Sequence, residues 1–162
     1  TGGSLSASKI YTMFGFQFPE DKVKIDPTKL SYQDIKFTKY NDILTIPGGN
    51  YSISDEGGDD TIILNGFSKE DISFQKIARD LSIRYGNDNY LMIRNQDNPT
   101  NRVETIKLMQ NEEVTGYITS SQIDKIIEQL NTYANDNGLT TITHDDISSN
   151  QNLMQIVMSG WN

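Results

Sequence analysis

The sequence predicts a mainly β protein: a body of short strands arranged as a β-roll or sandwich, followed by C-terminal amphipathic helices. Apolar and polar residues alternate in short runs over the first two thirds of the chain, and turn-forming residues separate these runs. After Tyr117 the alternation gives way to helical spacing. At 162 residues the chain is long enough to bury a core, and its 35% apolar content predicts a modest one.

The predicted strands are short segments in which every second residue is apolar. They lie at residues 23–25, 35–37, 43–46, 51–53, 61–64, 72–74, 81–83, 90–93 and 105–108. Turn signals such as Pro47-Gly48-Gly49-Asn50 and Asn65-Gly66 separate them. The alternation of Phe14, Phe16 and Phe18 predicts one more buried strand face near the N-terminus.

An internal repeat supports the β-rich interpretation. The segment from Asp34 to Ile46 aligns without a gap with the segment from Asp71 to Ile83, and both copies share Asp, Ile, Phe, Lys, Leu and Ile. We interpret the two copies as one hairpin-like unit with inward-facing Ile and Phe. Because two copies are few for a solenoid, other elements must complete the stacking at each end.

The C-terminal part predicts helices. Thr119 or Ser120 can N-cap a helix that ends at Asn137-Gly138. One face of this helix carries the apolar residues Ile123, Ile126, Ile127, Leu130, Tyr133 and Ala134. A second short helix is expected from about Asp145 or Asn150 to Met158.

These patterns divide the chain into three parts. Residues 1–24 are predicted to form an N-terminal strand segment or a cap on the roll, and residues 25–116 the β-rich body. Residues 117–162 form the helical C-terminal segment.

The most informative segment is an acidic turn at residues 55–63. Its glycines allow backbone conformations that other residues avoid, and oxygen atoms on such a turn can converge on one hard cation. The segment matches part of the calcium-binding β-roll repeat G-G-x-G-x-D-x-U-x, with Gly58, Asp60 and Ile62 at its fourth, sixth and eighth positions. The predicted calcium site uses the carboxylates of Asp55, Glu56, Asp59 and Asp60 and the carbonyls of Gly57 and Gly58.

The match to this repeat is partial. Asp55 and Glu56 stand where two glycines are expected, and tandem copies are missing. The preceding nine residues, Ile46 to Ser54, place Tyr51 where the repeat has an aspartate. Because calcium normally takes ligands from two successive turns, an ordinary acidic β-turn with weak or lost binding stays open as the alternative.

Over about residues 25–160 the repeat, the acidic turn and the tail resemble the C-terminal region of an RTX (haemolysin-type calcium-binding) protein. In that family, units written D-L/I-x-F…N-D-L-x-I follow turns of glycine and aspartate. Here the two repeat copies, Asp34 to Ile46 and Asp71 to Ile83, correspond to those units. The segments Ile118 to Ala134 and Asn152 to Ile156 look like the terminal segment of the family.

This resemblance implies a non-enzymatic, calcium-responsive domain of a protein secreted from a Gram-negative bacterial cell by a type I system. The uncleaved signal would lie in residues 117–162 and would be read by the ABC transporter machinery. Any toxin, protease, lipase or adhesin activity would belong to upstream domains of a larger parent protein. Calcium outside the cell would neutralise and fold a chain that stays loose in the calcium-poor cytosol.

Composition excludes several other classes. The net charge of −8 argues against nucleic acid and against anionic membrane surfaces as partners. The lack of cysteine excludes disulfides and zinc–thiolate sites. There is no run of 18 apolar residues, so we expect no membrane span.

Two further functions are considered. One is an adhesive or ligand-binding β-domain in which calcium only stiffens loops. The other is a small hydrolase that uses His144, the one histidine, with a nearby carboxylate or serine. Because triads assemble from distant segments and no Gly-x-Ser-x-Gly elbow occurs, we predict a solvent-facing loop histidine and no catalytic residue.

Overall fold

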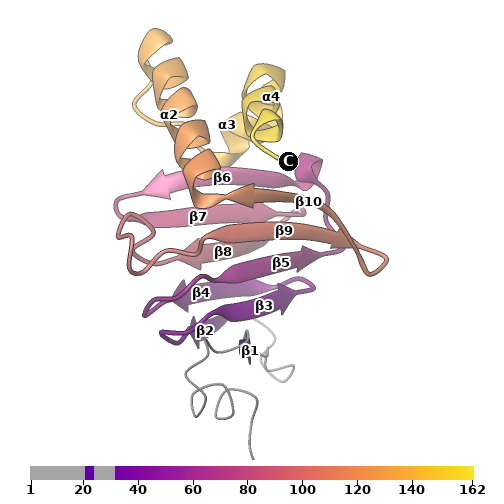
Figure 1. Cartoon of the computed structure of the whole chain (residues 1–162). Helices are drawn as coiled ribbons and strands as arrows, with labels where there is room; N and C mark the ends of the chain where they lie inside the picture. The colour runs from indigo at the N-terminus through magenta and orange to yellow at the C-terminus, as the bar shows by residue number, and fades with distance from the viewer. Residues whose placement is uncertain (1–20, 24–31) are drawn as a thin grey trace, which may run out of the picture.

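Two five-stranded sheets make up the body of the protein in the computed structural model, which describes residues 21–23 and 32–162. Figure 1 shows the strands stacked one above another. The first sheet has the order β1 (Asp21–Val23), β3 (Asp42–Ile46), β5 (Thr61–Asn65), β9 (Thr105–Gln110) and β10 (Glu113–Thr119). The second has the order β2 (Tyr32–Lys36), β4 (Asn50–Ser54), β8 (Asn89–Ile93), β7 (Asp80–Tyr85) and β6 (Ile72–Ile77). The prediction of a mainly β body with C-terminal helices is confirmed.

The chain winds as a coil, because consecutive strands from β1 to β5 alternate between the two sheets and each pairs in parallel with the strand one coil later. In the second sheet Tyr32 is opposite Asn50, and in the first sheet Ile43 is opposite Thr61. Both pairs are separated by the same length of chain, so the coils from β2 to β5 contain 18 residues. In these coils, residues 18 positions apart lie at the same corner of the roll.

The regular coil is interrupted once. After β5, the short 3₁₀ segment η2 (Lys69–Asp71) leads into the antiparallel hairpin β6–β7. The chain then returns through β8, which pairs in parallel with β4, and through β9, which pairs in parallel with β5. Strand β10 folds back antiparallel on β9 and is the last strand of its sheet.

The core lies between the sheets, since the inward residue of each strand pair is apolar. Leu44, Ile62 and Ile106 occupy one row of the first sheet, and each is at most 1% exposed. Tyr51, Leu91 and Ile83 occupy a row of the second sheet. This alternation is the pattern that the sequence shows.

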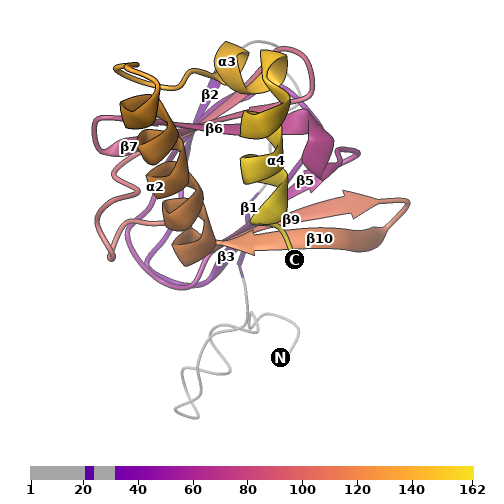
Figure 2. The same ribbon diagram turned by 90° about the horizontal axis from the view of Figure 1, so that it is seen from above.

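Three helices cover one end of the roll, above β6 and β10 (Figures 1 and 2). They are α2 (Ser120–Asp136), α3 (His144–Ser149) and α4 (Gln151–Ser159). The hydroxyl of Thr119 accepts a hydrogen bond from the Gln122 amide, and Gly138 adopts a φ of 67° just after the last turn, so both predicted ends of α2 are confirmed. The buried apolar face of this helical cap consists of Ile123, Ile126, Leu130, Ala134, Ile147, Leu153 and Val157. No helix in the described ranges is long and apolar enough to cross a membrane.

Two of the predictions for the β body need correction. The first copy of the repeat is not a hairpin, because β2 and β3 belong to different sheets; only the second copy, β6–β7, is one. Strand β10 is missed because the turn before it uses Asn111 and Glu112 at positive φ without a glycine. The strand predicted at Phe14, Phe16 and Phe18 lies outside the described residues.

Candidate metal centre

The acidic turn lies at a corner of the roll, where the chain crosses from the second sheet to the first. The turn between β4 and β5 is stacked on the equivalent turn of the previous coil, between β2 and β3. The backbones come so close that a Cβ placed on Gly58 would lie 2.2 Å from the carbonyl oxygen of Tyr40. Gly58 has a φ of +86°, so both its conformation and its surroundings require glycine.

Three buried carboxylates meet at this corner. Asp42 comes from one coil, whereas Asp55 and Asp60 come from the next. Each offers one oxygen, and the three oxygens lie within 4.8 Å of one another. Asp42 and Asp60 are 0% exposed and Asp55 is 6% exposed, which is unusual for acidic side chains.

Hydrogen bonds hold two of these carboxylates in place. The backbone N–H of Thr38 donates to Asp42 Oδ2 at 2.7 Å, and the backbone N–H of Asp42 donates to Asp60 Oδ1 at 2.8 Å. The other oxygen of Asp60 and both oxygens of Asp55 are buried, and no donor among the described residues reaches them while both carboxyls are ionised. Buried acceptors without a donor are costly, so these atoms need a proton or a cation.

The same arrangement continues into the next coil. The backbone N–H of Asp60 donates to Glu104 Oε1 at 2.8 Å, as that of Asp42 does to Asp60. Burial raises the pKa of Glu104, and the carboxylates of Asp59 and Asp55 raise it further. Asp42, Asp60 and Glu104 thus form an acidic ladder along one corner of the roll.

Electrostatic repulsion within the trio is severe when no cation is bound. Burial, and next the facing carboxyl of Asp55, raise the pKa of Asp60 to about 9. Burial also raises the pKa of Asp55. No ion pair in the described part of the chain joins Asp55 or Asp60 to a lysine or arginine. A divalent cation among the three oxygens would remove both the repulsion and the unpaired acceptors.

The structure brings together only some of the ligands predicted from the sequence. Asp55 and Asp60 face each other, whereas Glu56 and Asp59 are exposed to solvent. The backbone N–H of Asp59 donates to Asn41 Oδ1 at 2.8 Å, which joins the two turns. Gly57 and Gly58 form the turn with φ values of +141° and +86°.

Sequence reasoning missed Asp42. The signal was present, because Asn41-Asp42 precedes Ile43-Leu44 as Asp59-Asp60 precedes Thr61-Ile62, one 18-residue coil later. The nine residues before the acidic turn, Ile46 to Ser54, contain the turn at the opposite corner of the roll, so comparing the acidic turn with them could not identify Asp42.

That opposite corner is closed by tyrosines and asparagines. The hydroxyl of Tyr51 donates to the Gly48 carbonyl at 2.5 Å, and the hydroxyl of Tyr85 donates to the Gly49 carbonyl. Asn89 Oδ1 accepts from the Gly49 N–H at 3.0 Å, and Asn50 Oδ1 accepts from the Tyr90 N–H at 2.8 Å. These hydrogen bonds within the protein satisfy the backbone groups of this turn, at the corner where the nonapeptide repeat would have calcium ligands.

The prediction that His144 lies in a solvent-facing loop is wrong. His144 is the first residue of α3 and is 6% exposed. Its Nδ1 lies 2.7 Å from Ser73 Oγ and its Nε2 lies 2.9 Å from Ser82 Oγ. Both ring nitrogens are therefore occupied by serine hydroxyls, and neither is left for the carboxylate of a hydrolytic triad. Local sequence could not reveal these partners, which are more than 60 residues away.

The three carboxylates, all oxygen donors, suit hard divalent cations such as calcium, magnesium or manganese rather than softer, thiolate-binding metals. Comparison with known proteins places the chain in no family, since no protein-family model matches it and no curated protein matches it significantly.

Proposed function

We propose that this chain is a calcium-responsive part of a β-roll, in which one cation bound by Asp42, Asp55 and Asp60 joins two successive coils. The observation that carries this proposal is the meeting of three buried carboxylates at the junction of those coils, where both oxygens of Asp55 and one of Asp60 receive no hydrogen bond from the described residues. Because the ligands come from two coils, the site exists only when the coils are stacked. Cation binding is then coupled to folding.

Calcium is the cation that best suits this site. It accepts six to eight oxygen ligands in flexible geometry, so backbone carbonyls and water can complete a set that begins with three carboxylates. Magnesium requires near-ideal octahedral geometry and keeps its water shell, which a site with almost fully buried ligands disfavours.

We extend the proposal to the biological context that the resemblance to RTX proteins suggests. The chain would act outside the cell as the C-terminal, non-enzymatic part of a larger protein exported by type I secretion. The helical segment after Tyr117 would carry the signal read by the ABC transporter. The acidic composition and the 18-residue coil, twice the length of a nonapeptide, support this extension.

Calorimetry and circular dichroism during a calcium titration test the cation site. At calcium concentrations 100 times the Kd, the free energy of unfolding is expected to rise by about 2.7 kcal/mol. For a chain of this size this corresponds to an increase in Tm of roughly 5–10 °C. Equal concentrations of magnesium should give a clearly smaller shift. If the Tm is unchanged at millimolar calcium, the proposed site is wrong.

Two conservative variants distinguish the buried ligands from the exposed acids of the same turn. Asp55→Asn is expected to lower calcium affinity at least about tenfold, because it removes a charged ligand whose oxygens have no other partner. Glu56→Gln removes the same charge from an exposed neighbour and should change the affinity about twofold or less. Isothermal titration calorimetry measures both; equal losses would indicate that only the net charge of the turn matters.

The export proposal needs a test that leaves the fold intact, because deleting the helices would uncover the core that Ile126, Leu130 and Val157 close. The full chain can instead be fused to the C-terminus of a type I cargo that lacks its own signal. Secretion of the fusion that depends on the ABC transporter supports the proposal. Retention in the cytosol with a normal calcium response would refute the export role alone.

A further inference from the structure

One buried histidine contributes to the attachment of the helical cap to the roll. His144 begins α3, the helix that precedes α4, and its ring contacts the hairpin β6–β7 through Ser73 and Ser82. Its backbone N–H also donates to Gln75 Oε1 at 3.3 Å. The same residue therefore joins α3 to both strands of the hairpin.

The two hydrogen bonds between the ring and the serines require a neutral imidazole. A neutral ring has one N–H, so one serine hydroxyl accepts a hydrogen bond from the ring and the other donates to it. When a proton from water is added to the ring nitrogen that carries no hydrogen, both nitrogens become donors. The serine that had donated must then turn its hydroxyl away and find another acceptor in a buried setting.

The surroundings add to the cost of a positive charge on this ring. The ionisable and polar groups that face His144 are Ser73 and Gln75 of β6, Ser82 and Arg84 of β7, Tyr90 of β8 and Asp145 of α3. Arg84 donates to the His144 carbonyl oxygen at 3.0 Å, so its guanidinium lies next to the ring. Asp145 is the one carboxylate of this group, and Arg84 already binds it at 2.7 Å.

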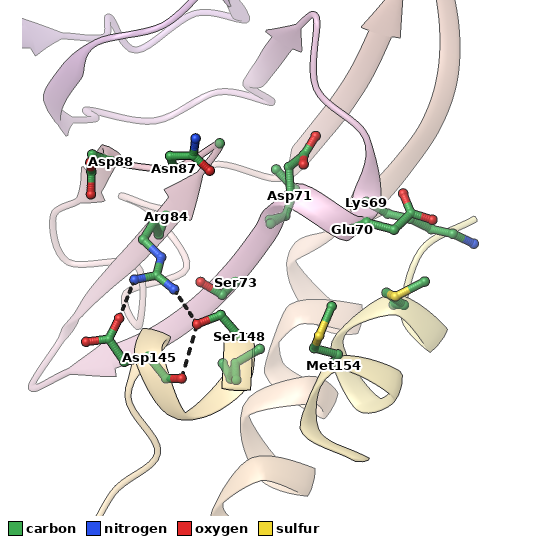
Figure 3. A pocket seen from close by; sticks show the side chains of 14 residues that line it. Lys69, Glu70, Asp71, Ser73, Arg84, Asn87, Asp88, Asp145, Ser148 and Met154 are labelled. Carbon is green, nitrogen blue, oxygen red and sulfur yellow. Dashed lines mark hydrogen bonds and ion pairs between the residues drawn. The ribbon is translucent and has the colours of Figure 1, made fainter. Parts of the chain in front are cut away.

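Figure 3 shows that Arg84 points at Asp145 and Ser148, at the wall of an open cavity of about 480 Å³. Ser73, a partner of the histidine ring, also lines this cavity. Water and protons thus reach the edge of the contact between the helices and the hairpin.

We infer that His144 is an acid-sensitive latch: protonation of its ring weakens the docking of α3 and α4 on the hairpin β6–β7 while the parallel roll stays folded. This inference is independent of the proposed calcium site, which shares no residue with the latch. It assigns to the helical cap a conformational change that the rest of the fold does not undergo.

The electrostatic setting supports this direction. Burial, and next the charge of Arg84, lower the pKa of His144 to about 4, compared with 6.5 for a free histidine. A histidine whose pKa is lowered by docking stabilises the docked state above pH 6.5, and this stabilisation is lost as the pH falls towards 4. Between a pH well above 6.5 and a pH well below 4, the docking equilibrium is expected to weaken by up to roughly 300-fold.

The chain contains its own reporter of docking. Trp161, the one tryptophan, follows α4 and stacks on Phe74 of β6 with ring centroids 6.2 Å apart. When the full chain is titrated from pH 7.5 to 3.5, we expect the Trp161 emission to shift to longer wavelength while the β signal in circular dichroism persists. NMR follows the ring of the one histidine in the same titration, and its midpoint should lie well below 6.5.

Two variants make the test decisive. His144→Gln cannot take up a proton, so its Trp161 emission should not change with pH over this range. Asp145→Asn removes the carboxylate that Arg84 binds beside the ring and should keep the acid transition of the natural chain. The inference is overturned if His144 titrates near pH 6.5, if Asp145→Asn abolishes the transition, or if the β signal and the Trp161 signal change together. Should His144→Gln fail to fold, the histidine titration and Asp145→Asn decide the question.

Discussion

Replacing Asp60 with asparagine is expected to raise the stability of the calcium-free chain and to abolish its stabilisation by calcium. In calcium-free buffer at pH 7, folding forces the buried Asp60 carboxyl to hold a proton, because its pKa is raised to about 9. Asparagine has nearly the same shape, carries no charge, and its Oδ1 can still accept from the Asp42 N–H. The variant should therefore be more stable than the natural chain by roughly 2–4 kcal/mol.

The variant is expected to lose the response to calcium. Asp60→Asn loses one of three charged ligands, so the calcium-dependent increase in Tm should disappear. Thermal unfolding with excess calcium and with chelator measures both effects. Asp59→Asn is the matched control, since it removes the same charge from the exposed neighbour and should keep the calcium response. If Asp60→Asn is less stable than the natural chain in calcium-free buffer, the repulsion inferred among Asp42, Asp55 and Asp60 is wrong.

The pH dependence of the calcium-free chain follows from the same group. Because the pKa of Asp60 is higher in the folded state than in the unfolded state, its contribution to stability is complete below pH 3.8 and is lost as the pH rises towards 9. The natural chain should lose stability over this range, and Asp60→Asn should lose less. Calcium competes with the proton, so it should stabilise the chain most on the alkaline side.

The second large effect is expected for Gly58→Ala. An added Cβ would lie 2.2 Å from the Tyr40 carbonyl oxygen and 2.5 Å from its carbon, and both are backbone atoms that cannot move without separating the coils. The φ of +86° adds strain of its own. We expect a loss of at least about 3 kcal/mol in the free energy of unfolding, together with the loss of calcium binding.

Gly66→Ala separates the two causes. Gly66 has a similar φ of +94°, but no atom lies within 4 Å of its added Cβ. This variant should lose only about 1 kcal/mol, the cost of the backbone conformation alone. Urea unfolding of the two variants gives the comparison. Equal losses would show that the close approach of the coils does not limit stability.

Local patterns predicted most of the fold, because strand alternation and helix caps depend on neighbouring residues. Thr119 and Gly138 mark the ends of α2 through their own side-chain and backbone chemistry. The pairing of strands was harder, since one repeat unit forms a hairpin at β6–β7 and two separate strands at β2 and β3. The units differ at their central turn, where Ala78 adopts a positive φ in the hairpin, whereas the Thr38 N–H donates to Asp42 in the first copy.

The candidate site was half predicted for a related reason. Asp55 and Asp60 belong to a recognisable turn, whereas Asp42 joins them only through the 18-residue coil. Burial then separates Asp60 from its exposed neighbour Asp59, although the two are chemically identical. Similarly, the buried position of His144 depends on serines from a distant hairpin, which no local window contains.

The two corners of the roll differ in the groups that hold them, and this difference makes only one of them sensitive to charge. One side is fastened permanently by the phenols of Tyr51 and Tyr85, which need nothing from the solvent. The other is held by backbone N–H groups that donate to carboxylates, from Asp42 to Asp60 and from Asp60 to Glu104. Protons change the charge of this corner because the pKa of Asp60 is raised to about 9, whereas the tyrosine corner has no carboxylate in its hydrogen bonds. The register of the coils is therefore kept on one side by contacts that do not depend on pH between about 4 and 9.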